Sequence, residues 1–204
     1  MSFYEQRFLP HLVNWSMRQP AFIEYRSRVL GTAEGRVLEI GIGSGLNLPH
    51  YRDVVRHVIG LEPSSKLLTM ARGAGKKAVP SVELVQGSAE AIPLENESVH
   101  TVVSTWTLCS VPAVEGALAE IRRVLKPGGR LLFVEHGLSP DSGVRLWQDR
   151  LTPMWKRIAG GCHLNRPIPQ LIERAGFCLE QMATGYMPGP RPMTFMYEGS
   201  ARIT

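Results

Sequence analysis

The feature that most constrains the fold of this chain is a glycine-rich turn that directly follows a short apolar strand. Residues 36–40 predict the strand, and Gly41, Gly43 and Gly45 follow it in a GxGxG pattern. Glycines at this point let the backbone turn tightly and approach a ligand without a Cβ in the way. Turns of this kind are typical of α/β folds that bind nucleotide-like ligands where the first strand ends.

After the turn, strand-like and helix-like patterns alternate along the chain. Strands are predicted at 57–61, 82–85, 99–104, 130–135, 177–184 and 193–201, and helices at 64–74, 112–125, 141–158 and 167–175. Apolar positions at helical spacing predict two further short amphipathic helices within the first 31 residues. The sequence therefore predicts an α/β, Rossmann-like three-layer sandwich. Its sheet is mostly parallel and seven-stranded, with an antiparallel edge strand and N-terminal helices.

Length and composition are consistent with one such domain. The chain has 204 residues, of which 44% are hydrophobic, and it shows no internal repeat, low-complexity segment or linker. No run of about 18 apolar residues is present, so no membrane span is predicted. The N-terminus also lacks the apolar core of a signal peptide. A cytoplasmic location is expected.

The cysteines and the charge argue against several function classes. Cys109, Cys162 and Cys178 are scattered and form no CxxC pair, so neither a zinc site nor a disulfide framework is predicted. The formal net charge is +5, with the excess mostly in 140–204, but no basic run indicates nucleic-acid binding. This excess is compatible with ordinary solubility or with peripheral contact to an anionic membrane surface.

Two acidic residues near the glycine turn indicate which ligand it binds. Glu39 stands two places before the first glycine, where it would repel a pyrophosphate but tolerate a sulfonium cation that carries an α-ammonium group. Glu62 ends the second strand, where a carboxylate can accept hydrogen bonds from ribose hydroxyls. A dinucleotide turn would also place its third glycine one residue later. These features favour S-adenosylmethionine over NAD, and an NAD-dependent oxidoreductase is the rival interpretation.

Four segments resemble motifs of the class I S-adenosylmethionine-dependent methyltransferases, and the resemblance covers nearly the whole chain. They are VLEIGIGSG at 37–45, GLEPS at 60–64, GSAEAIPL at 87–94 and LKPGGRL at 125–131. Within this class the chain resembles the type-11 branch, which includes quinone, phosphatidylethanolamine and alkyl-thiol methyltransferases. The segments that are similar to the membrane-associated alkyl-thiol group in particular are TLCSV at 107–111, EH at 135–136 and GCHLNR at 161–166.

The resemblance implies S-adenosylmethionine as cofactor, S-adenosylhomocysteine as product and one methyltransferase domain over 1–204. The expected parts are an N-terminal helical cap (1–31), a cofactor-binding half (36–136), a lid segment (140–165) and a C-terminal substrate-side half (166–204). Cofactor contacts are expected from Glu39, Gly41, Gly43, Gly45, Asn47, Glu62, Pro63, Gly87, Ser88, Ala89 and Thr105. Ser88 departs from the family pattern, which usually offers an Asp to the adenine amino group at this position.

Methyl transfer from a sulfonium is an in-line displacement that needs no covalent enzyme intermediate, and no metal is expected here. An acceptor with a thiol or hydroxyl group must lose its proton, so a general base can help. His136, just past the fifth strand, is the first candidate, and His163, in a loop before a helix, is the second. The alternatives are a hydrogen bond from His136 to a loop carbonyl and an ordinary turn at His163.

The predicted helix 141–158 bears on the acceptor. One face is apolar and the other basic: the apolar residues are Val144, Trp147, Leu151, Met154, Trp155 and Ile158, and the basic ones are Arg145, Arg150, Lys156 and Arg157. The apolar stripe predicts either core packing or a lid over an apolar acceptor, with the basic residues toward a headgroup or membrane.

The stretch 105–108 lacks the paired carbonyl groups that orient a planar amine. We therefore expect a small apolar or lipid-like acceptor, with an alkyl thiol first and a phospholipid amine or a quinol second. A non-catalytic module that binds S-adenosylmethionine or a membrane surface is the remaining alternative. The sequence makes no prediction of oligomeric state.

Overall fold

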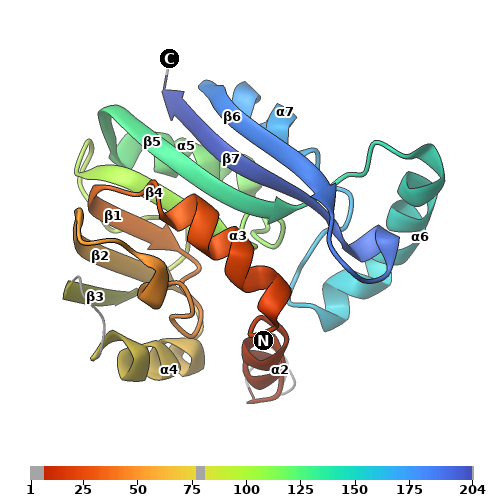
Figure 1. The fold of residues 1–204 in the computed structure, drawn as a ribbon, viewed down its shortest axis with the longest axis horizontal. Helices are drawn as coiled ribbons and strands as arrows, with labels where there is room; N and C mark the ends of the chain where they lie inside the picture. Colours follow the sequence, from red (N-terminus) through yellow and green to blue (C-terminus); the bar gives the residue numbers. More distant parts are fainter. Residues whose placement is uncertain (1–6, 77–80, 204) are drawn as a thin grey trace.

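The computed structural model describes residues 7–76 and 81–203, and these form a seven-stranded sheet in the order β3-β2-β1-β4-β5-β7-β6 (Figure 1). The strands are β1 (Gly35–Ile40), β2 (Val55–Glu62), β3 (Ser81–Gln86), β4 (Val99–Thr105), β5 (Leu125–His136), β6 (Phe177–Tyr186) and β7 (Phe195–Ile203). β7 runs antiparallel to β5 and β6, and the pairs among β1 to β5 are parallel. The predicted fold class is confirmed, with the antiparallel strand one place inside the edge.

The helices fall close to their predicted positions. They are α2 (Leu9–Ser16), α3 (Pro20–Leu30), α4 (Ser65–Gly75), α5 (Val114–Val124), α6 (Ser142–Ile158) and α7 (Ile168–Arg174). Pro20 occupies the first turn of α3, where its missing N–H costs nothing. The side chain of Ser64 caps α4 by accepting a hydrogen bond from the Leu67 N–H.

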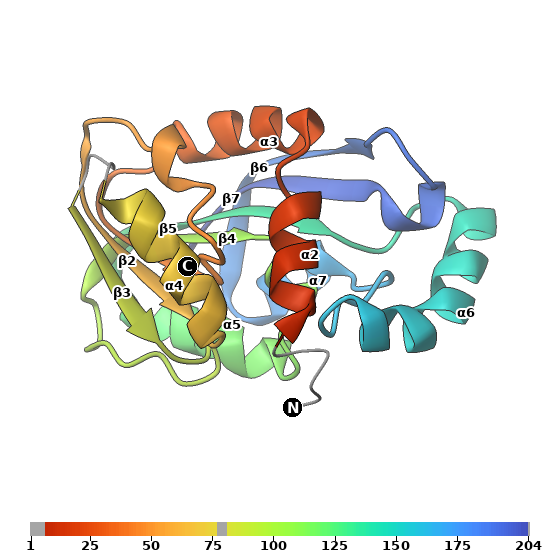
Figure 2. The same ribbon diagram turned by 90° about the horizontal axis from the view of Figure 1, so that it is seen from below.

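Side chains that alternate along the strands divide the core between the two faces of the sheet. Leu38 of β1 joins the cluster that α5 and α7 cover, whereas Val37 joins the cluster that α3 and α4 cover. Figure 2 shows α3 and α5 on opposite sides of the sheet. This three-layer arrangement leaves the carboxyl ends of β1, β2, β4 and β5 together at one edge.

Helix α6 packs differently from the other helices. It buries the polar residues Gln148 and Thr152, while Trp147, Met154 and Ile158 are 53%, 58% and 45% exposed. Gln148 donates to the Gly137 carbonyl at 3.0 Å and accepts from the Ser139 N–H at 2.9 Å. Core packing is therefore the wrong interpretation for these three residues of the apolar stripe, because side-chain hydrogen bonds hold the inner face of the helix.

Helices α2 and α6 both lie beside the edge where the parallel strands end, in both ribbon views. A Cβ on Gly160, just after α6, would lie 3.2 Å from a methyl carbon of Leu9 in α2, so the two helices are neighbours. Phe8, Leu12 and Trp15 are 58%, 48% and 70% exposed near α2. Within the described ranges, no helix is long and apolar enough to cross a membrane.

Candidate functional site

The glycine turn after β1 has the backbone conformation that its sequence predicts. Gly41, Gly43 and Gly45 have φ angles of 64°, 58° and 82°, which L-amino acids with side chains rarely adopt. A Cβ on Gly41 would collide with the Thr107 side chain. Among the described residues, a Cβ on Gly43 would meet only the Gly41 carbonyl oxygen, at 3.9 Å, so these residues leave the space over Gly43 open.

Glu62 lies beside this open space at the end of β2. Its side chain is buried, and its two carboxylate oxygens accept hydrogen bonds from the Gly43 N–H at 3.0 Å and the Ser64 N–H at 2.9 Å. Burial raises the pKa of Glu62, and these two N–H groups oppose that rise. Pro63, which lies between Glu62 and Ser64 in the sequence, is exposed. The structure thus fixes a carboxylate at the wall of the space over Gly43.

A second carboxylate, Glu39, lies fully buried at the end of β1. Its two oxygens accept from the Asn47 side-chain amide at 2.8 Å and the Tyr51 hydroxyl at 2.7 Å. The same amide donates to the Thr105 hydroxyl at 2.9 Å, and Arg26 donates to the Asn47 carbonyl oxygen at 2.9 Å. Burial raises the pKa of Glu39 to about 7. The fold therefore joins three predicted cofactor residues and adds Arg26 and Tyr51, which the sequence analysis missed.

The N-terminal helices contact this site directly. The Ser44 hydroxyl in the glycine turn donates to the Asn14 side chain at 2.7 Å. From α3, Phe22 packs edge-on against Trp106 with ring centroids 4.9 Å apart, and the Arg26 guanidinium lies 5.0 Å from the Trp106 ring. Trp106 follows β4 with a φ of 52°, a strained value for an aromatic residue. The sequence analysis did not single out Trp106, and its position directly after β4 was the only sequence feature that could have indicated a role in the site.

The predicted adenine loop is attached to Glu62 through the backbone. The Gly87 N–H donates to the Glu62 carbonyl at 3.2 Å. The Ser88 hydroxyl donates to the Glu90 carboxylate at 3.0 Å and accepts from the Glu90 N–H at 3.2 Å. Ala89 between them is buried. The loop therefore carries a carboxylate at Glu90, two positions beyond the place where the family usually has an Asp.

Glu135 organises the loop that follows β4. This carboxylate is fully buried and accepts from the Ser104 hydroxyl at 2.6 Å and from the backbone N–H groups of Thr107, Leu108 and Cys109 at 3.0 to 3.1 Å. Burial raises the pKa of Glu135, although each of these donors lowers it. The sequence analysis assigned it no role, because the groups that bind it are mostly backbone.

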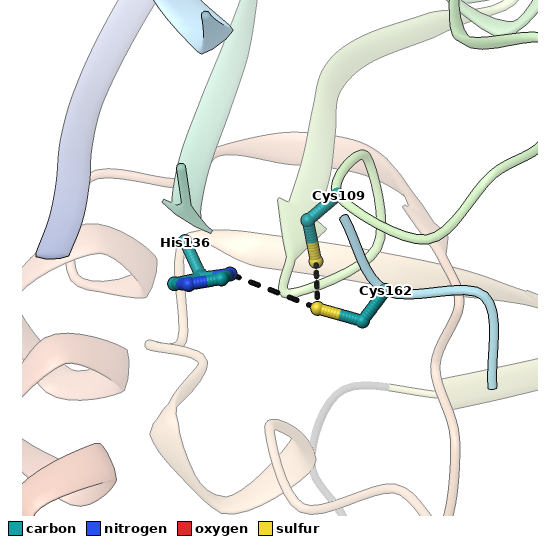
Figure 3. Close-up of side chains that lie close together, drawn as sticks. All are labelled: Cys109, His136 and Cys162. Atoms are coloured by element: carbon teal, nitrogen blue, oxygen red, sulfur yellow. Dashed lines mark hydrogen bonds between the residues drawn. The ribbon is translucent and has the colours of Figure 1, made fainter. Parts of the chain in front are cut away.

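His136, the predicted base, lies next to two thiols instead of a loop carbonyl (Figure 3). Its Nδ1 is 3.6 Å from the Cys162 Sγ, which is 3.8 Å from the Cys109 Sγ. His136 and Cys109 are buried, and among the described residues the His136 Nε2 has no hydrogen-bond partner. The hydrogen bond between the thiols raises the pKa of Cys109 and lowers that of Cys162.

This grouping bears on one prediction. The sequence analysis predicted no zinc site because the cysteines form no CxxC pair, and in the structure the ligand atoms of Cys109, His136 and Cys162 all lie within 4.8 Å of one another. The grouping cannot be detected from sequence spacing, because 53 residues separate the two cysteines along the chain. Sequence spacing detects ligands only when they share one turn or helix, whereas these come from three separate segments.

His163, the second candidate base, lies beside the same cluster but faces the backbone. Its Nδ1 is 3.3 Å from the Cys109 carbonyl oxygen, and the backbone N–H of His163 donates to the same carbonyl at 2.8 Å. Partial burial lowers the pKa of His163. The turn that was the alternative interpretation is therefore present, with the imidazole held against it.

A cavity at the opposite edge of the sheet is separate from these residues. It has a volume of about 920 Å³, and its lining includes Glu97, Arg122 and Pro127, close to the amino ends of β4 and β5. Open α/β sheets bind their ligands at the carboxyl ends of the strands. Because this cavity is at the opposite edge and contains none of the predicted site residues, we assign the functional site to the glycine turn and the segments around it.

Comparisons with known proteins indicate the family of the chain. A methyltransferase domain model matches residues 38–133. Thiol S-methyltransferase TMT1B of Rattus norvegicus is 37% identical over 153 residues, 73% of this chain and 62% of that protein. TMT1B of Homo sapiens is 33% identical over 171 residues, 82% of this chain and 70% of that protein. The chain thus spans less than two thirds of the rat relative.

The chain is also similar to a phospholipid methyltransferase and to a methyltransferase of known structure. Phosphatidylethanolamine N-methyltransferase of Cereibacter sphaeroides is 36% identical over 104 residues, 50% of this chain and 51% of that protein. The crystal structure of a SAM-dependent methyltransferase from Aquifex aeolicus superimposes with a TM-score of 0.68 at 18% identity, covering 97% of this chain and 100% of that one. With its glycine turn, its buried Glu62 and these relatives, the chain belongs to the family of S-adenosylmethionine-dependent methyltransferases.

Proposed function

We propose that this chain transfers a methyl group from S-adenosylmethionine to a small apolar or lipid-like acceptor, with a thiol favoured. The observation that carries the proposal is the open space over Gly43, with the buried Glu62 carboxylate at its wall. S-adenosylmethionine supplies an electrophilic methyl group to a nucleophile that is aligned with it. The chain's own residues bind, orient and exclude water around that reaction.

The cofactor residues have separate roles in this proposal. Glu62 accepts hydrogen bonds from the ribose, and Gly41, Gly43 and Gly45 give the backbone room to approach it. Glu39 fixes the side chain of Asn47, and its charge favours a cationic amino-acid end of the cofactor. The remaining contacts are proposed from Pro63, Gly87, Ser88, Ala89 and Thr105.

A thiol acceptor is supported by the similarity to TMT1B and by the chemistry beside β5. The relative's name describes thiol S-methylation, and it is similar over most of this chain. A thiol must lose its proton before it attacks efficiently. We propose His136 as the catalytic residue for this step and His163 as a second one at the same loop. In both cases the imidazole lies next to Cys109.

The exposed side chains of α2 and α6 support an apolar or lipid-like acceptor. Trp15, Trp147 and Met154 are each more than half exposed, and they flank the carboxyl edge of the sheet. These apolar side chains are in contact with water. Covering them with an apolar ligand or a lipid surface is therefore favourable in free energy. We propose 140–165 as the lid and α2 as its neighbour in a peripheral membrane contact.

A second candidate is a phospholipid amine or a quinol as acceptor. The observation that favours it is the ring of exposed basic residues on α6, with Arg145, Arg150, Lys156 and Arg157 beside the exposed apolar ones. Such a helix suits an anionic lipid surface. The similarity to phosphatidylethanolamine N-methyltransferase covers half of the chain and supports the same alternative.

Methyl-labelled S-adenosylmethionine, offered with each acceptor class in turn, tests the proposal. The full chain should label simple alkyl thiols faster than phosphatidylethanolamine vesicles, reduced quinones or small amines. Labelling of vesicles or quinols alone would replace the thiol with the second candidate. Cofactor binding in calorimetry with no labelling of any class would reduce the chain to a non-catalytic binding module, and binding of NAD in its place would revive the oxidoreductase.

A further inference from the structure

We propose that Cys109, Cys162 and His136 form a zinc site whose fourth position takes the sulfur of an acceptor thiol. The three side chains come from the loop after β4, the loop after α6 and the end of β5, and Figure 3 shows them pointing toward one another. The three ligand atoms meet within 4.8 Å. The assignment of the fourth position rests on the proposed thiol function, whereas the metal site does not.

Two of the three separations of the ligand atoms match a tetrahedral ion, and the third pair, Cys109 and His136, lies within 4.8 Å. Zinc binds thiolate sulfur at about 2.3 Å and imidazole nitrogen at about 2.0–2.1 Å, so tetrahedral geometry places two sulfurs about 3.8 Å apart and a sulfur and a nitrogen about 3.5 Å apart. The Cys109 and Cys162 sulfurs are 3.8 Å apart, and the Cys162 sulfur is 3.6 Å from the His136 Nδ1. A hydrogen bond between two thiols is weak, so it does not by itself account for this convergence.

The donor set also selects the metal. Two thiols and one imidazole suit zinc, while carboxylate sites suit magnesium or calcium. The carboxylate of Glu135 interacts electrostatically with both cysteines, but four hydrogen-bond donors from β4 and the loop after it, including the Cys109 N–H, already occupy it. It thereby holds the Cys109 backbone in place without being a ligand. Three protein ligands and an open fourth position are typical of catalytic zinc sites.

The surroundings suit a site with two thiolates. Arg166 is buried, interacts electrostatically with both cysteines and donates a hydrogen bond to the Leu108 carbonyl beside them. Two thiolates and one divalent cation are neutral together, which lowers the cost of burying them. With zinc on Nδ1, the His136 Nε2 would carry the ring proton, and this buried atom has no protein partner among the described residues.

The acceptor step is then one of acid–base chemistry and coordination. The S–H bond of the acceptor breaks, its proton passes to solvent, and the sulfur binds zinc through the electron pair that remains, so no electron is gained or lost. Zinc makes the thiolate available at neutral pH. In this arrangement His136 acts as a ligand, and the metal replaces it as the means of deprotonation.

Metal analysis of the full chain, purified under reducing conditions and titrated with Zn²⁺ alone, tests the site. Wild type should bind about one zinc per chain, and Cys162→Ser and His136→Gln should each weaken binding by at least about tenfold. Cys178→Ser is the matched control, because Cys178 is exposed on β6. This variant should bind zinc as wild type does. Thermal unfolding of each variant verifies that it is folded.

Replacement of zinc by Co²⁺ supplies a readout that is independent of turnover. Sulfur-to-cobalt absorption should appear in wild type and in Cys178→Ser and be reduced in Cys162→Ser. Addition of a simple alkyl thiol should change this absorption in wild type.

Absence of zinc uptake by the reduced chain, or a Cys109–Cys162 disulfide that forms in its place, would overturn the site. Thiol methylation that is undiminished in metal-free wild type would refute the role of the fourth position. Zinc binding without methylation of any thiol would instead remove the proposed function and leave the metal site standing.

Discussion

The cofactor side and the acceptor side of the site are built in opposite ways. On the cofactor side, Glu39 and Glu62 are buried, and both oxygens of each carboxylate accept hydrogen bonds from nearby groups. On the acceptor side, Trp147 and Met154 are more than half exposed, and the His136 Nε2 is buried with no partner in the described part of the chain. The two carboxylates of the first side have both oxygens occupied, whereas the second side has unused binding capacity.

This difference separates a fixed function from a variable one. One cofactor requires one geometry, and a carboxylate that is held from both sides provides it. An acceptor that differs from one relative to another can be accommodated by side chains that make few contacts of their own. If the two sides are independent, a substitution on one side leaves binding at the other side unchanged.

The largest effect is expected from Gly43→Val. Its positive φ disfavours a branched side chain, and the valine would fill the open space in which we place the cofactor. Cofactor affinity should fall by at least about a hundredfold, which corresponds to about 2.7 kcal/mol, in isothermal titration. Gly73→Ala in α4, where a Cβ meets nothing within 4 Å, is the control. Unchanged binding by Gly43→Val would move the cofactor site away from this turn.

Glu62→Ala should weaken cofactor binding by about 1.5–3 kcal/mol, the range for hydrogen bonds to a charged group. Glu62→Gln keeps one carbonyl oxygen and should lose less. The same titrations provide the measurement, with circular dichroism to verify folding. If both variants lose affinity equally, the role of Glu62 is to hold the Gly43 and Ser64 N–H groups and not to contact the ribose.

On the acceptor side, Trp147→Ser combined with Met154→Ser should reduce sedimentation with anionic vesicles by about tenfold, because two apolar groups no longer enter the lipid surface. The free energy of unfolding should change by less than about 0.5 kcal/mol, since both residues are exposed. Met182→Ser, 47% exposed on β6, is the control. Cofactor affinity that falls together with vesicle binding would show that the two sides are coupled.

Glu39 makes the free energy of unfolding depend on pH. Its native pKa of about 7 lies above its ordinary value of 4.5, so the native state holds more protons than the unfolded state between these values. The free energy of unfolding should therefore fall as pH rises through this range. Glu39→Gln should flatten that slope in thermal melts from about pH 5 to pH 8, whereas Glu24→Gln, with an 82% exposed side chain, should not. An equal slope in wild type and Glu39→Gln would contradict the raised pKa.

The sequence predicted most of the fold and the cofactor side because the relevant signals are local. Gly41 to Gly45 form one turn, and Glu62 ends one strand, so spacing alone places them. Arg26, Tyr51 and Glu135 escaped prediction because their partners lie in other elements or on the backbone. The cluster of Cys109, His136 and Cys162 escaped for the same reason.

Helix α6 shows a different limit of the sequence pattern. Its apolar residues repeat at helical spacing, which identifies the helix but not the face that turns inward. The structure turns Gln148 and Thr152 inward, because backbone groups such as the Ser139 N–H and the Gly137 carbonyl need partners there. Periodicity therefore predicted the helix correctly and left its orientation to tertiary hydrogen bonds.

The polar inner face of α6 has a consequence for how an acceptor enters. Water can replace the hydrogen bonds of Gln148 when the helix separates from the loop after β5, and little apolar surface is newly exposed because the buried residues of α6 are polar. We therefore expect α6 to undock at a low free-energy cost, well below that of global unfolding. Contact with a lipid surface would then favour the undocked state, so membrane binding itself would open a path for the acceptor to the site.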